Sequence, residues 1–503
     1  MDPQLADYST NWWIEYATAA KLFNFPDKRG PGGSIPEPEV ASSFAVSKDG
    51  RVYTFEIQDG FRFSDGSPVT AGSFAYAIDR VANHDLASPG ARFIVDPAGT
   101  NIVGAGEVVR GYGRHVKGVV AKGDRLVIRL IKPDAAFVSK LTMPYFQATS
   151  RKLPLSRKNL SPYPSAGPYA FTAPGREFLV SIRRNQYWTP GPGRRRPRNL
   201  AGLDFDWGKS QYAFFAQVEA NQLDETIVPW DEAQRSAKRY GVNKARFWVE
   251  PQTCTDWLSL NMSGRLFKNN LPLRQAVNYV INRRAYAAVT GPYSGRPWTH
   301  ILNPGVPGWR SVTIYKHDLR RARRLAKGHL RGGKITVYYH DVGLGQAQAL
   351  VVRQNLTKLG FRLKNITMKG VLDNFYPDGY FSSRKTDMDL AVQTGWCAQY
   401  PDPYDFINFH FDGHMIRAGT NPNNSLMDLP KWNRRMEAAA RLVGPRRFRV
   451  YGQLDLDLMR RVAPVAVVQT YSNRFLFSKR VDAKSLVYHG IYQDWSIPAL
   501  RLK

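Results

Sequence analysis

The segment Tyr53–Arg80 reads "YTFEIQDGFRFSDGSPVTAGSFAYAIDR" and contains several changes of chain direction in a short span. Apolar and polar residues alternate in Tyr53–Gln58, which predicts a strand with one buried face. Two Asp-Gly pairs, Asp59–Gly60 and Asp65–Gly66, predict turns, because glycine adopts positive φ and aspartate bonds its own backbone. Between these turns Phe61–Ser64 alternates again, which predicts a second, short strand.

A helix is predicted in the second half of the same segment. Thr70 has the short polar side chain of a helix N-cap, and Phe74, Ile78 and Val81 follow it at helical spacing. The segment therefore predicts a strand, a turn, a short strand, a turn and a helix. It contains no chemically reactive group, and its residues alone indicate a compact αβ corner.

The length and composition of the chain predict a globular protein of two or three domains. It has 503 residues, of which 43% are hydrophobic and 22% are charged. This length exceeds what one hydrophobic core normally organises. No run of about eighteen apolar residues occurs, so the sequence predicts no membrane-spanning helix.

The net charge is strongly positive. Lys and Arg number 71 against 41 Asp and Glu, which gives +30. The excess is densest at Gly193–Arg198, Asp318–Lys327 and Gly444–Val450. A basic surface attracts polyanions, so a nucleic-acid- or polyanion-binding protein is one interpretation. Solvated charged faces are the simpler interpretation, because no zinc-finger, RNP-type or basic-zipper pattern accompanies the charge.

The sequence contains few signals of catalysis, a cofactor or a metal. It has no Gly-x-x-x-x-Gly-Lys loop, no Gly-x-Ser-x-Gly elbow and no His-Glu-x-x-His. His410, Asp412 and His414 lie close together in "HFDGH", where a metal could use them, although such clusters are more often surface polarity. We therefore predict no enzyme, no cofactor and no metal. Two cysteines, Cys254 and Cys397, allow one internal disulfide.

The second half of the chain indicates an α/β domain. Lys334–His340 predicts a strand, Gly345–Gly360 a helix and Phe361–Met368 a second strand, which together form a βαβ unit. An amphipathic helix is predicted at Leu271–Val289, and another strand begins in Asp387–Trp396.

Read in order, these segments resemble the bacterial family 5 extracellular solute-binding proteins, the oligopeptide- and dipeptide-binding components of ABC importers. Tyr53–Arg80 is similar to the family's signature segment. The resemblance continues in order along the whole chain through "LADYSTNWWIEYATAAKLFNF", "SAGPYAFT" (165–172), "VSIRRNQYWTPGP" (180–192), "EANQLDETIV" (219–228), "LSLNMSGRLFKNNLPLRQAVNYVINRRAY" (258–286) and "GWCAQYPDPYDFINFHF" (395–411).

The resemblance implies a fold class and a domain organisation. The fold would be α/β, a two-lobed periplasmic-binding-protein-like fold of type II, peptide-binding class, with an extra αβ subdomain. Two strands would cross between the lobes, near Cys254–Asn261 and Pro464–Ser472. The implied bounds are 1–43, 165–252 and 468–503 for lobe I, 44–164 for the extra subdomain and 253–467 for lobe II.

The resemblance also implies a function. The protein would capture a peptide or peptide-like solute in an inter-lobe cleft, close around it by hinge motion and deliver it to the membrane permease of an ABC importer. It would act as a monomer in the periplasm or at the extracellular face of the membrane. Relatives start with a signal peptide and a first strand, whereas this chain starts at Met1-Asp2-Pro3. We therefore expect a truncated or mis-started form of an exported protein.

The same resemblance implies the site residues. The ligand loop would contribute Trp396, Gln399, Tyr400 and Asp402, and lobe I would contribute Trp12 and Trp13. Some relatives join cysteines at the positions of Cys254 and Cys397, so a disulfide is expected there.

Gln399 departs from the family pattern. Peptide-binding relatives carry at this position an Asp that binds the free amino terminus of the peptide. A carboxamide brings no negative charge, so weaker discrimination for a free ammonium is expected. Alternatively, Asp402 takes over the ammonium, or the register of the loop differs by one residue from that of the relatives. Asp402 lies between two prolines, which also makes it a candidate turn residue.

Overall fold

The structure, a computed structural model, describes residues 2–7, 9–96, 99–157, 162–173, 177–189, 191, 196–372, 386–416 and 421–503. Residues 193–195 of the predicted basic stretch 193–198 lie outside this description. Within it, no helix combines the length and the apolar character that a membrane crossing requires.

The chain divides into two compact units. Unit 1 comprises residues 1–229, 240–248 and 475–503, and unit 2 comprises 230–239 and 249–474. Three elements contribute residues to both units: α6 (Ala233–Tyr240), β11 (Phe247–Leu260) and β17 (Val465–Phe477). Strand β11 begins before Cys254–Asn261, the first segment that was predicted to cross between the lobes. Strand β17 ends after Pro464–Ser472, the second such segment. The finer bounds given above for a lobe I, an extra subdomain and a lobe II stay a prediction.

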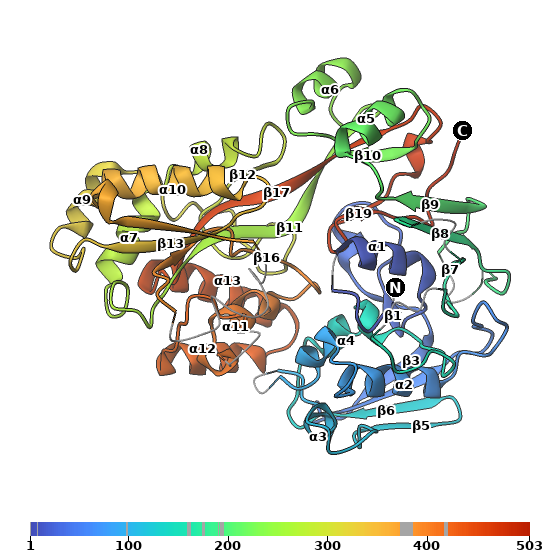
Figure 1. The fold of residues 1–503 in the computed structure, drawn as a ribbon. Coiled ribbons are helices and arrows are strands. Elements are labelled where there is room, and N and C mark those ends of the chain that lie inside the picture. The colour runs from blue at the N-terminus through green and yellow to red at the C-terminus, as the bar shows by residue number, and fades with distance from the viewer. Residues whose placement is uncertain are drawn as a thin grey trace. The chain divides into compact units, whose positions relative to one another are not determined.

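The start of the segment Tyr53–Arg80 belongs to a four-stranded antiparallel sheet of unit 1 (Figure 1). The sheet order is β3 (Ala41–Val46), β4 (Val52–Ile57), β6 (Arg125–Arg129), β5 (Val119–Lys122). Apolar side chains of β4 are buried in alternation, as period two predicts. The short strand predicted at Phe61–Ser64 is wrong. In its place there is one isolated bridge, between Arg62 and Pro68, flanked by hydrogen bonds from Phe63 N to Ser67 O at 2.8 Å and from Val69 N to Phe61 O at 2.9 Å.

The helix that follows is α2 (Ala71–Ala82), and it begins where the sequence predicts. Thr70 is its N-cap, and Thr70 and Ser73 form a reciprocal capping box. The apolar side chains Phe74, Ile78 and Val81 are all buried, and α2 packs against β5 and β6. The helix therefore covers the sheet with the face that its spacing defines.

A second part of unit 1 surrounds α1 (Ser9–Thr18). A three-stranded antiparallel sheet orders β7 (Tyr169–Phe171), β8 (Leu179–Arg184) and β9 (Gly202–Asp206). Its core joins Ile14 and Ala17 of α1 to Tyr169, Ile182 and Phe205 of the sheet. The remaining strands and α-helices of unit 1 are β1 (Phe23–Asn24), β2 (Glu37–Pro38), α3 (Ala105–Val109), α4 (Phe137–Lys140), α5 (Gln211–Glu219), β10 (Glu225–Ile227), β18 (Tyr488–His489) and β19 (Asp494–Trp495).

The largest sheet has the path β10-β17-β11-β15-β13-β14, where β15 is Leu390–Ala391, β13 is Ile335–His340 and β14 is Ile366–Val371. Strand β10 pairs with Phe475–Phe477 of β17 within unit 1, and β13, β14 and β15 belong to unit 2. Strands β13 and β14 pair in parallel, with α10 (Gly345–Leu359) between them in the chain. The predicted βαβ unit is therefore confirmed. Its second strand begins later than expected, because a short 3-10 helix, η4 (Leu363–Asn365), precedes it.

The single helix predicted at Leu271–Val289 is wrong, because the structure has two helices. α7 (Leu271–Val280) ends at the extended residue Ile281, and α8 (Arg283–Ala288) begins after Asn282. The side chain of Asn282 accepts a hydrogen bond from Ala285 N at 3.0 Å. This N-cap competes with a continuous helix. The other strands and α-helices of unit 2 are β12 (Gly295–Pro297), α9 (Leu319–Ala326), β16 (Trp396–Cys397), α11 (Ile407–Phe411), α12 (Pro430–Ala440) and α13 (Gly444–Arg461).

Candidate functional site

The loop predicted to bind ligand begins at a strand pair of unit 2. Strand β16 pairs antiparallel with β11, so that Cys397 lies opposite Cys254 and Trp396 lies opposite Thr255. The two cysteines form a disulfide across this pair. The disulfide and the strand pairing together hold the start of the loop on β11.

Gly395, the residue before β16, lies against the same strand. A Cβ atom added to Gly395 would lie 2.2 Å from the backbone oxygen of Thr255 and 2.5 Å from Cα of Asp256. Both of these atoms belong to the backbone of β11, which cannot yield as a flexible side chain can. The close approach therefore requires glycine at this position.

Asp405 organises the loop that follows. Its Oδ2 accepts a hydrogen bond from the backbone N–H of Gln399 at 2.7 Å and another from Nε1 of Trp396 at 3.2 Å. The side chain of Asp405 is fully buried. One carboxylate therefore fixes two of the predicted ligand-binding positions relative to each other. Asp405 was not predicted as a site residue from the sequence, although it lies in the motif "YPDPYD".

The exposure of the predicted loop residues differs. Trp396 and Gln399 are half-buried, whereas Tyr400 and Asp402 are buried. The Trp396 ring contacts those of Phe409 and His410, with centroids 5.4 and 4.5 Å apart. Trp396 and Gln399 therefore have side-chain surface that solvent reaches.

The carboxylate of Asp402 has structural partners on both oxygens. Arg447 donates from Nε to Oδ2 at 3.0 Å and from Nη2 to Oδ1 at 2.8 Å. Oδ1 also accepts from Tyr404 N at 2.9 Å, which caps the short helix η5 (Pro403–Asp405). Both side chains of this ion pair are buried. The bidentate arrangement satisfies the negative charge of Asp402 inside unit 2.

Trp12 and Trp13 belong to α1 of unit 1. The Trp12 side chain is buried, donates from Nε1 to the backbone oxygen of Ala6 at 2.7 Å and packs edge-on against Tyr145. Trp13 is half-buried and donates from Nε1 to the backbone oxygen of Trp495 at 2.6 Å. The six predicted ligand-binding residues thus divide between the units, four on one loop of unit 2 and two on one helix of unit 1.

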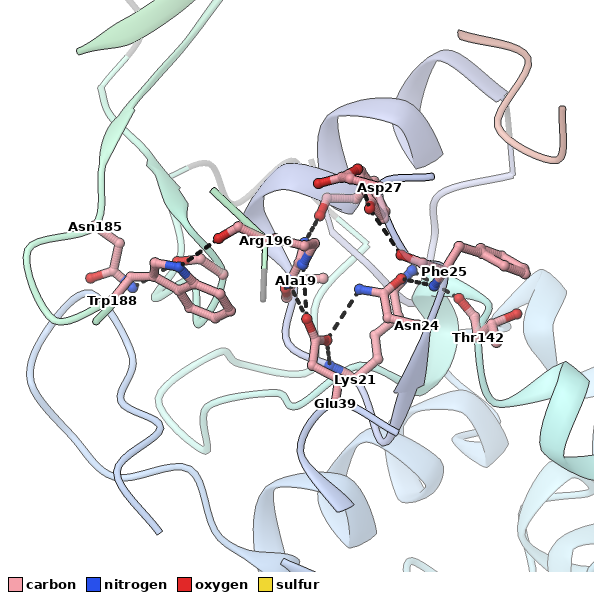
Figure 2. A network of polar contacts seen from close by, with 12 residues as sticks. Ala19, Lys21, Asn24, Phe25, Asp27, Glu39, Thr142, Asn185, Trp188 and Arg196 are labelled. Atoms are coloured by element: carbon pink, nitrogen blue, oxygen red, sulfur yellow. Dashed lines mark hydrogen bonds and ion pairs between the residues drawn. The ribbon is translucent and has the colours of Figure 1, made fainter. Parts of the chain in front are cut away.

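A buried charge network in unit 1 was not predicted from the sequence (Figure 2). Arg196 donates from Nε to Oε1 of Glu39 at 2.8 Å and from Nη2 to the backbone oxygen of Ala19 at 2.5 Å. Oε2 of the same glutamate accepts from the backbone N–H of Lys21 at 2.8 Å and from Nδ2 of Asn24 at 3.1 Å. Both glutamate oxygens are therefore used to join separate chain segments.

Two further groups beside this network have displaced pKa values. Burial and, to a smaller extent, the nearby Arg196 lower the pKa of Lys21 to about 7, while Glu39 opposes the shift. Burial also raises the pKa of Glu15 to about 8. Neither oxygen of Glu15 has a hydrogen-bond partner among the described residues. Glu15 is therefore neutral through most of the physiological range.

A second buried carboxyl lies next to the ligand loop, on β11. Oδ2 of Asp256 accepts hydrogen bonds from the hydroxyls of Tyr286 at 3.0 Å and Tyr471 at 2.8 Å. Burial raises the pKa of Asp256 to about 6, and the two hydroxyls limit the rise. The two tyrosines attach α8 and β17 to this strand.

One cluster in unit 2 has the donor set of a metal site. His414 Nδ1 lies 2.9 Å from Oδ1 of Asp412 and 3.2 Å from Oε1 of Glu437. Within the described ranges this is the one group of three such ligands. His410, which the sequence groups with them, instead bonds the backbone oxygen of Pro422 at 2.8 Å through Nδ1. Hydrogen bonds between the imidazole and the two carboxylates account for the cluster without an ion.

Comparison with known proteins identifies similar chains. The model of the bacterial extracellular solute-binding proteins, family 5 Middle, matches residues 36–414. The glutathione-binding protein GsiB of Salmonella paratyphi A is 24% identical over 373 residues, which cover 71% of this chain and 66% of GsiB. The oligopeptide-binding protein OppA of Bacillus subtilis is 23% identical over 397 residues, which cover 75% of this chain and 70% of OppA. The chain thus spans slightly less than two thirds of the length of GsiB.

A solved structure matches the entire chain. The clavulanic acid biosynthesis oligopeptide binding protein 2 superposes with a TM-score of 0.88 at 20% identity, covering 100% of this chain and 93% of that chain. At this level of identity the likeness shows a shared fold.

Proposed function

The chain belongs to the bacterial extracellular solute-binding proteins of family 5, and from this premise we propose that it captures a peptide or peptide-like solute for an ABC importer. The observation that carries the proposal is the family match over residues 36–414, which includes the loop organised by Asp405. The names of GsiB and OppA, which bind glutathione and oligopeptides, support this class of solute.

The proposal assigns direct contacts with the solute to Trp396 and Gln399. Both side chains are half-buried, and both positions are held by the same buried carboxylate. The Trp396 ring offers an apolar surface, and the Gln399 amide offers a donor and an acceptor without charge. Such a pair suits a neutral or N-blocked peptide group as well as it suits a free amino terminus.

Other predicted residues have different parts in the proposal. Tyr400 and Asp402 are buried, so we assign them to holding the loop in place and not to contact with the solute. The charge of Asp402 is already paired with Arg447. In unit 1, Trp13 keeps more accessible surface than Trp12 and is the better candidate for contact with solute. The proposal requires no bond chemistry and assigns no catalytic residue.

The cellular setting follows from the family. We place the protein in the periplasm or at the extracellular face of the membrane, as a monomer that delivers its solute to a membrane permease. The expected hinge closure stays a prediction. It would arise from contacts that the solute makes in one conformation and lacks in another.

Calorimetry and thermal denaturation with a set of short peptides test the proposed function. A peptide that binds the folded chain raises its Tm in proportion to the logarithm of the peptide concentration. The matched control is Trp396→Ala, which we expect to remove most of the shift. A shift that is equal in the parent protein and in this variant would contradict the assigned site.

A further inference from the structure

The positive charge of the chain is concentrated in one stretch of unit 2. Residues 261–370 contain 20 Lys and Arg but only two acidic residues, Asp318 and Asp341, which gives +18 of the total +30. All residues of this stretch are described. The stretch has just over a fifth of the chain length and more than half of the net charge. The excess is therefore local and does not reflect a uniformly basic composition.

Helix α9 lies at the centre of this charge and packs against α7 and α10 (Figure 1). Its exposed cations are Arg320, Arg321, Arg323, Arg324 and, directly after the helix, Lys327. Nε of Arg323 donates to the backbone oxygen of Lys358 at 2.9 Å, which joins the end of α10 to this helix.

Two neighbouring segments extend the same surface. Arg331 donates from Nη1 to the backbone oxygens of Arg265 at 2.6 Å and Lys268 at 2.7 Å, which brings two loops together. After α10, exposed Arg362 and Lys364 add two more cations. We call the cations of α9, of these loops and of residues 358–364 the α9 face.

The α9 face lacks compensating acids. Asp318 is its one carboxylate, and this side chain caps α9 by accepting from Arg321 N at 2.9 Å. Over the described part of the chain, none of the cations of the α9 face forms an ion pair. Like charges at this density repel one another and destabilise the folded unit. A polyanionic partner would relieve that repulsion.

One apolar side chain distinguishes between classes of polyanion. Leu363, between Arg362 and Lys364 on η4, is 60% exposed. Interfacial membrane contact combines cations with apolar groups that enter the headgroup boundary, and Leu363 between two cations supplies one such group. The ring of Tyr279, with Cζ of Arg321 of α9 4.4 Å from its centroid, is buried, so it offers no exposed stacking platform for bases.

We propose that the α9 face docks unit 2 on a lipid bilayer rich in anionic phospholipid, through charge attraction and insertion of Leu363. Each Lys or Arg side chain near such a surface contributes a similar increment to the free energy of membrane binding. This docking concerns the surface of unit 2 and does not depend on which solute the protein binds. It would hold the protein at the membrane that contains its permease.

Vesicle flotation of the full chain tests the docking. The probes are phosphatidylcholine vesicles with and without about one third phosphatidylglycerol, at about 0.1 M and about 0.5 M salt. The test variant changes four exposed cations of the α9 face to Gln: Arg320, Arg324, Lys327 and Arg362. A matched control changes four exposed cations of unit 1 to Gln: Lys48, Arg114, Lys122 and Arg129. A third variant, Leu363→Ser, leaves the charge unchanged.

The expected results separate local docking from general charge. The parent protein binds only the anionic vesicles, and binding falls steeply with salt. Each cation removed from the α9 face lowers the partition coefficient about fivefold. The variant with four substitutions should therefore have a partition coefficient lower by about a hundredfold or more. The partition coefficient of Leu363→Ser should be about threefold to tenfold lower than that of the parent, with the same salt dependence. The partition coefficient of the unit 1 control should stay within about twofold of the parent value.

Three results would overturn the proposal. The first is equal loss in the unit 1 control, which would mean that total charge and not the α9 face drives binding. The second is no difference between Leu363→Ser and the parent. The third is tighter binding to duplex DNA than to the anionic vesicles at the same salt, which would assign the face to nucleic acid.

Discussion

The buried carboxylate of Asp405 and the backbone N–H of Gln399 are joined by a hydrogen bond of 2.7 Å. The same oxygen also accepts from the indole of Trp396. One side chain thus fixes the two loop positions to which the proposed function assigns the solute. The contact is local, since its partners are only six positions apart in the chain, but it depends on the turn that η5 makes after Asp402.

Replacing Asp405 with Ala is expected to weaken both stability and solute binding. The change leaves two donors in a partly buried loop without their acceptor, which costs about 1–3 kcal/mol in the free energy of unfolding. Urea denaturation and calorimetry with a bound peptide measure the two effects. Asp405→Asn retains one side-chain oxygen, so it should lose less stability and less peptide affinity than Asp405→Ala. An Ala variant with unchanged midpoint and affinity would refute the role given to this carboxylate.

The disulfide between Cys254 and Cys397 is expected to stabilise the chain by restricting the unfolded state. The partners are 143 positions apart in the chain. For a closed loop of this length the chain-entropy model gives about 4–5 kcal/mol, as an upper figure. A Cys254→Ser/Cys397→Ser double variant should therefore unfold at a clearly lower denaturant concentration. Thiol titration of the unfolded, unreduced protein provides the control, and two free thiols would contradict the pairing.

Local patterns in the sequence predict the elements that are stabilised locally. Strand β4 and the start of α2 follow from alternation and from the N-cap Thr70, whose partners lie within a few residues. The break between α7 and α8 was missed, because the helical spacing of apolar residues continues through it. What ends α7 is the competing cap of Asn282, together with Arg283, whose guanidinium bonds the distant backbone oxygen of Val467 at 2.7 Å.

The candidate site was predicted less completely than the fold. Resemblance to a family supplied Trp396, Gln399, Tyr400 and Asp402, but not the partners of these residues. The pairing of Asp402 with Arg447 spans 45 positions and has no signature in the sequence. Arg196 and Glu39 are farther apart still, at 157 positions. A single sequence does not indicate which of its many basic residues becomes buried against a given carboxylate.

Glu15 is expected to make the stability of the protein fall as pH rises. Burial raises its pKa from 4.5 to about 8. Between these values the folded state keeps a proton that the unfolded state has released, so the unfolded state binds fewer protons. From pH 5 to pH 7 this should reduce the free energy of unfolding by about 1–3 kcal/mol.

The variant Glu15→Gln has no carboxyl group that can ionise at this position. It should therefore lack the pH-dependent contribution of Glu15 to the free energy of unfolding. Denaturant titrations of the parent and the variant at pH 5 and pH 7 measure the difference, which should favour the variant more at pH 7. Lys21, whose pKa is lowered to about 7, contributes with the opposite sign, mainly between pH 7 and 10.5. The interval from pH 5 to pH 7 lies below most of that range, so Lys21 contributes little to the measured difference. Parallel pH profiles of the two proteins would refute the assignment to Glu15.

Gln399→Asp is expected to change the preference for peptide termini. The new carboxylate would pair with a free ammonium, and charge-assisted hydrogen bonds contribute about 1.5–3 kcal/mol against about 1 kcal/mol for neutral ones. Free peptides should therefore gain about twofold to thirtyfold in affinity over their N-acetylated forms. Calorimetry on matched free and acetylated peptides measures this ratio. Acetylation-sensitive, tight binding by the parent protein would show that another group binds the ammonium.

The most direct test of the proposed function is native mass spectrometry of the protein purified under mild conditions. The family assignment and the loop held by Asp405 predict a bound species that dissociates on unfolding and fragments as a peptide or peptide-like compound. Trp396→Ala, purified in the same way, should carry much less of it. A bound species without peptide-like fragments, or equal occupancy in the parent and the variant, would contradict the account.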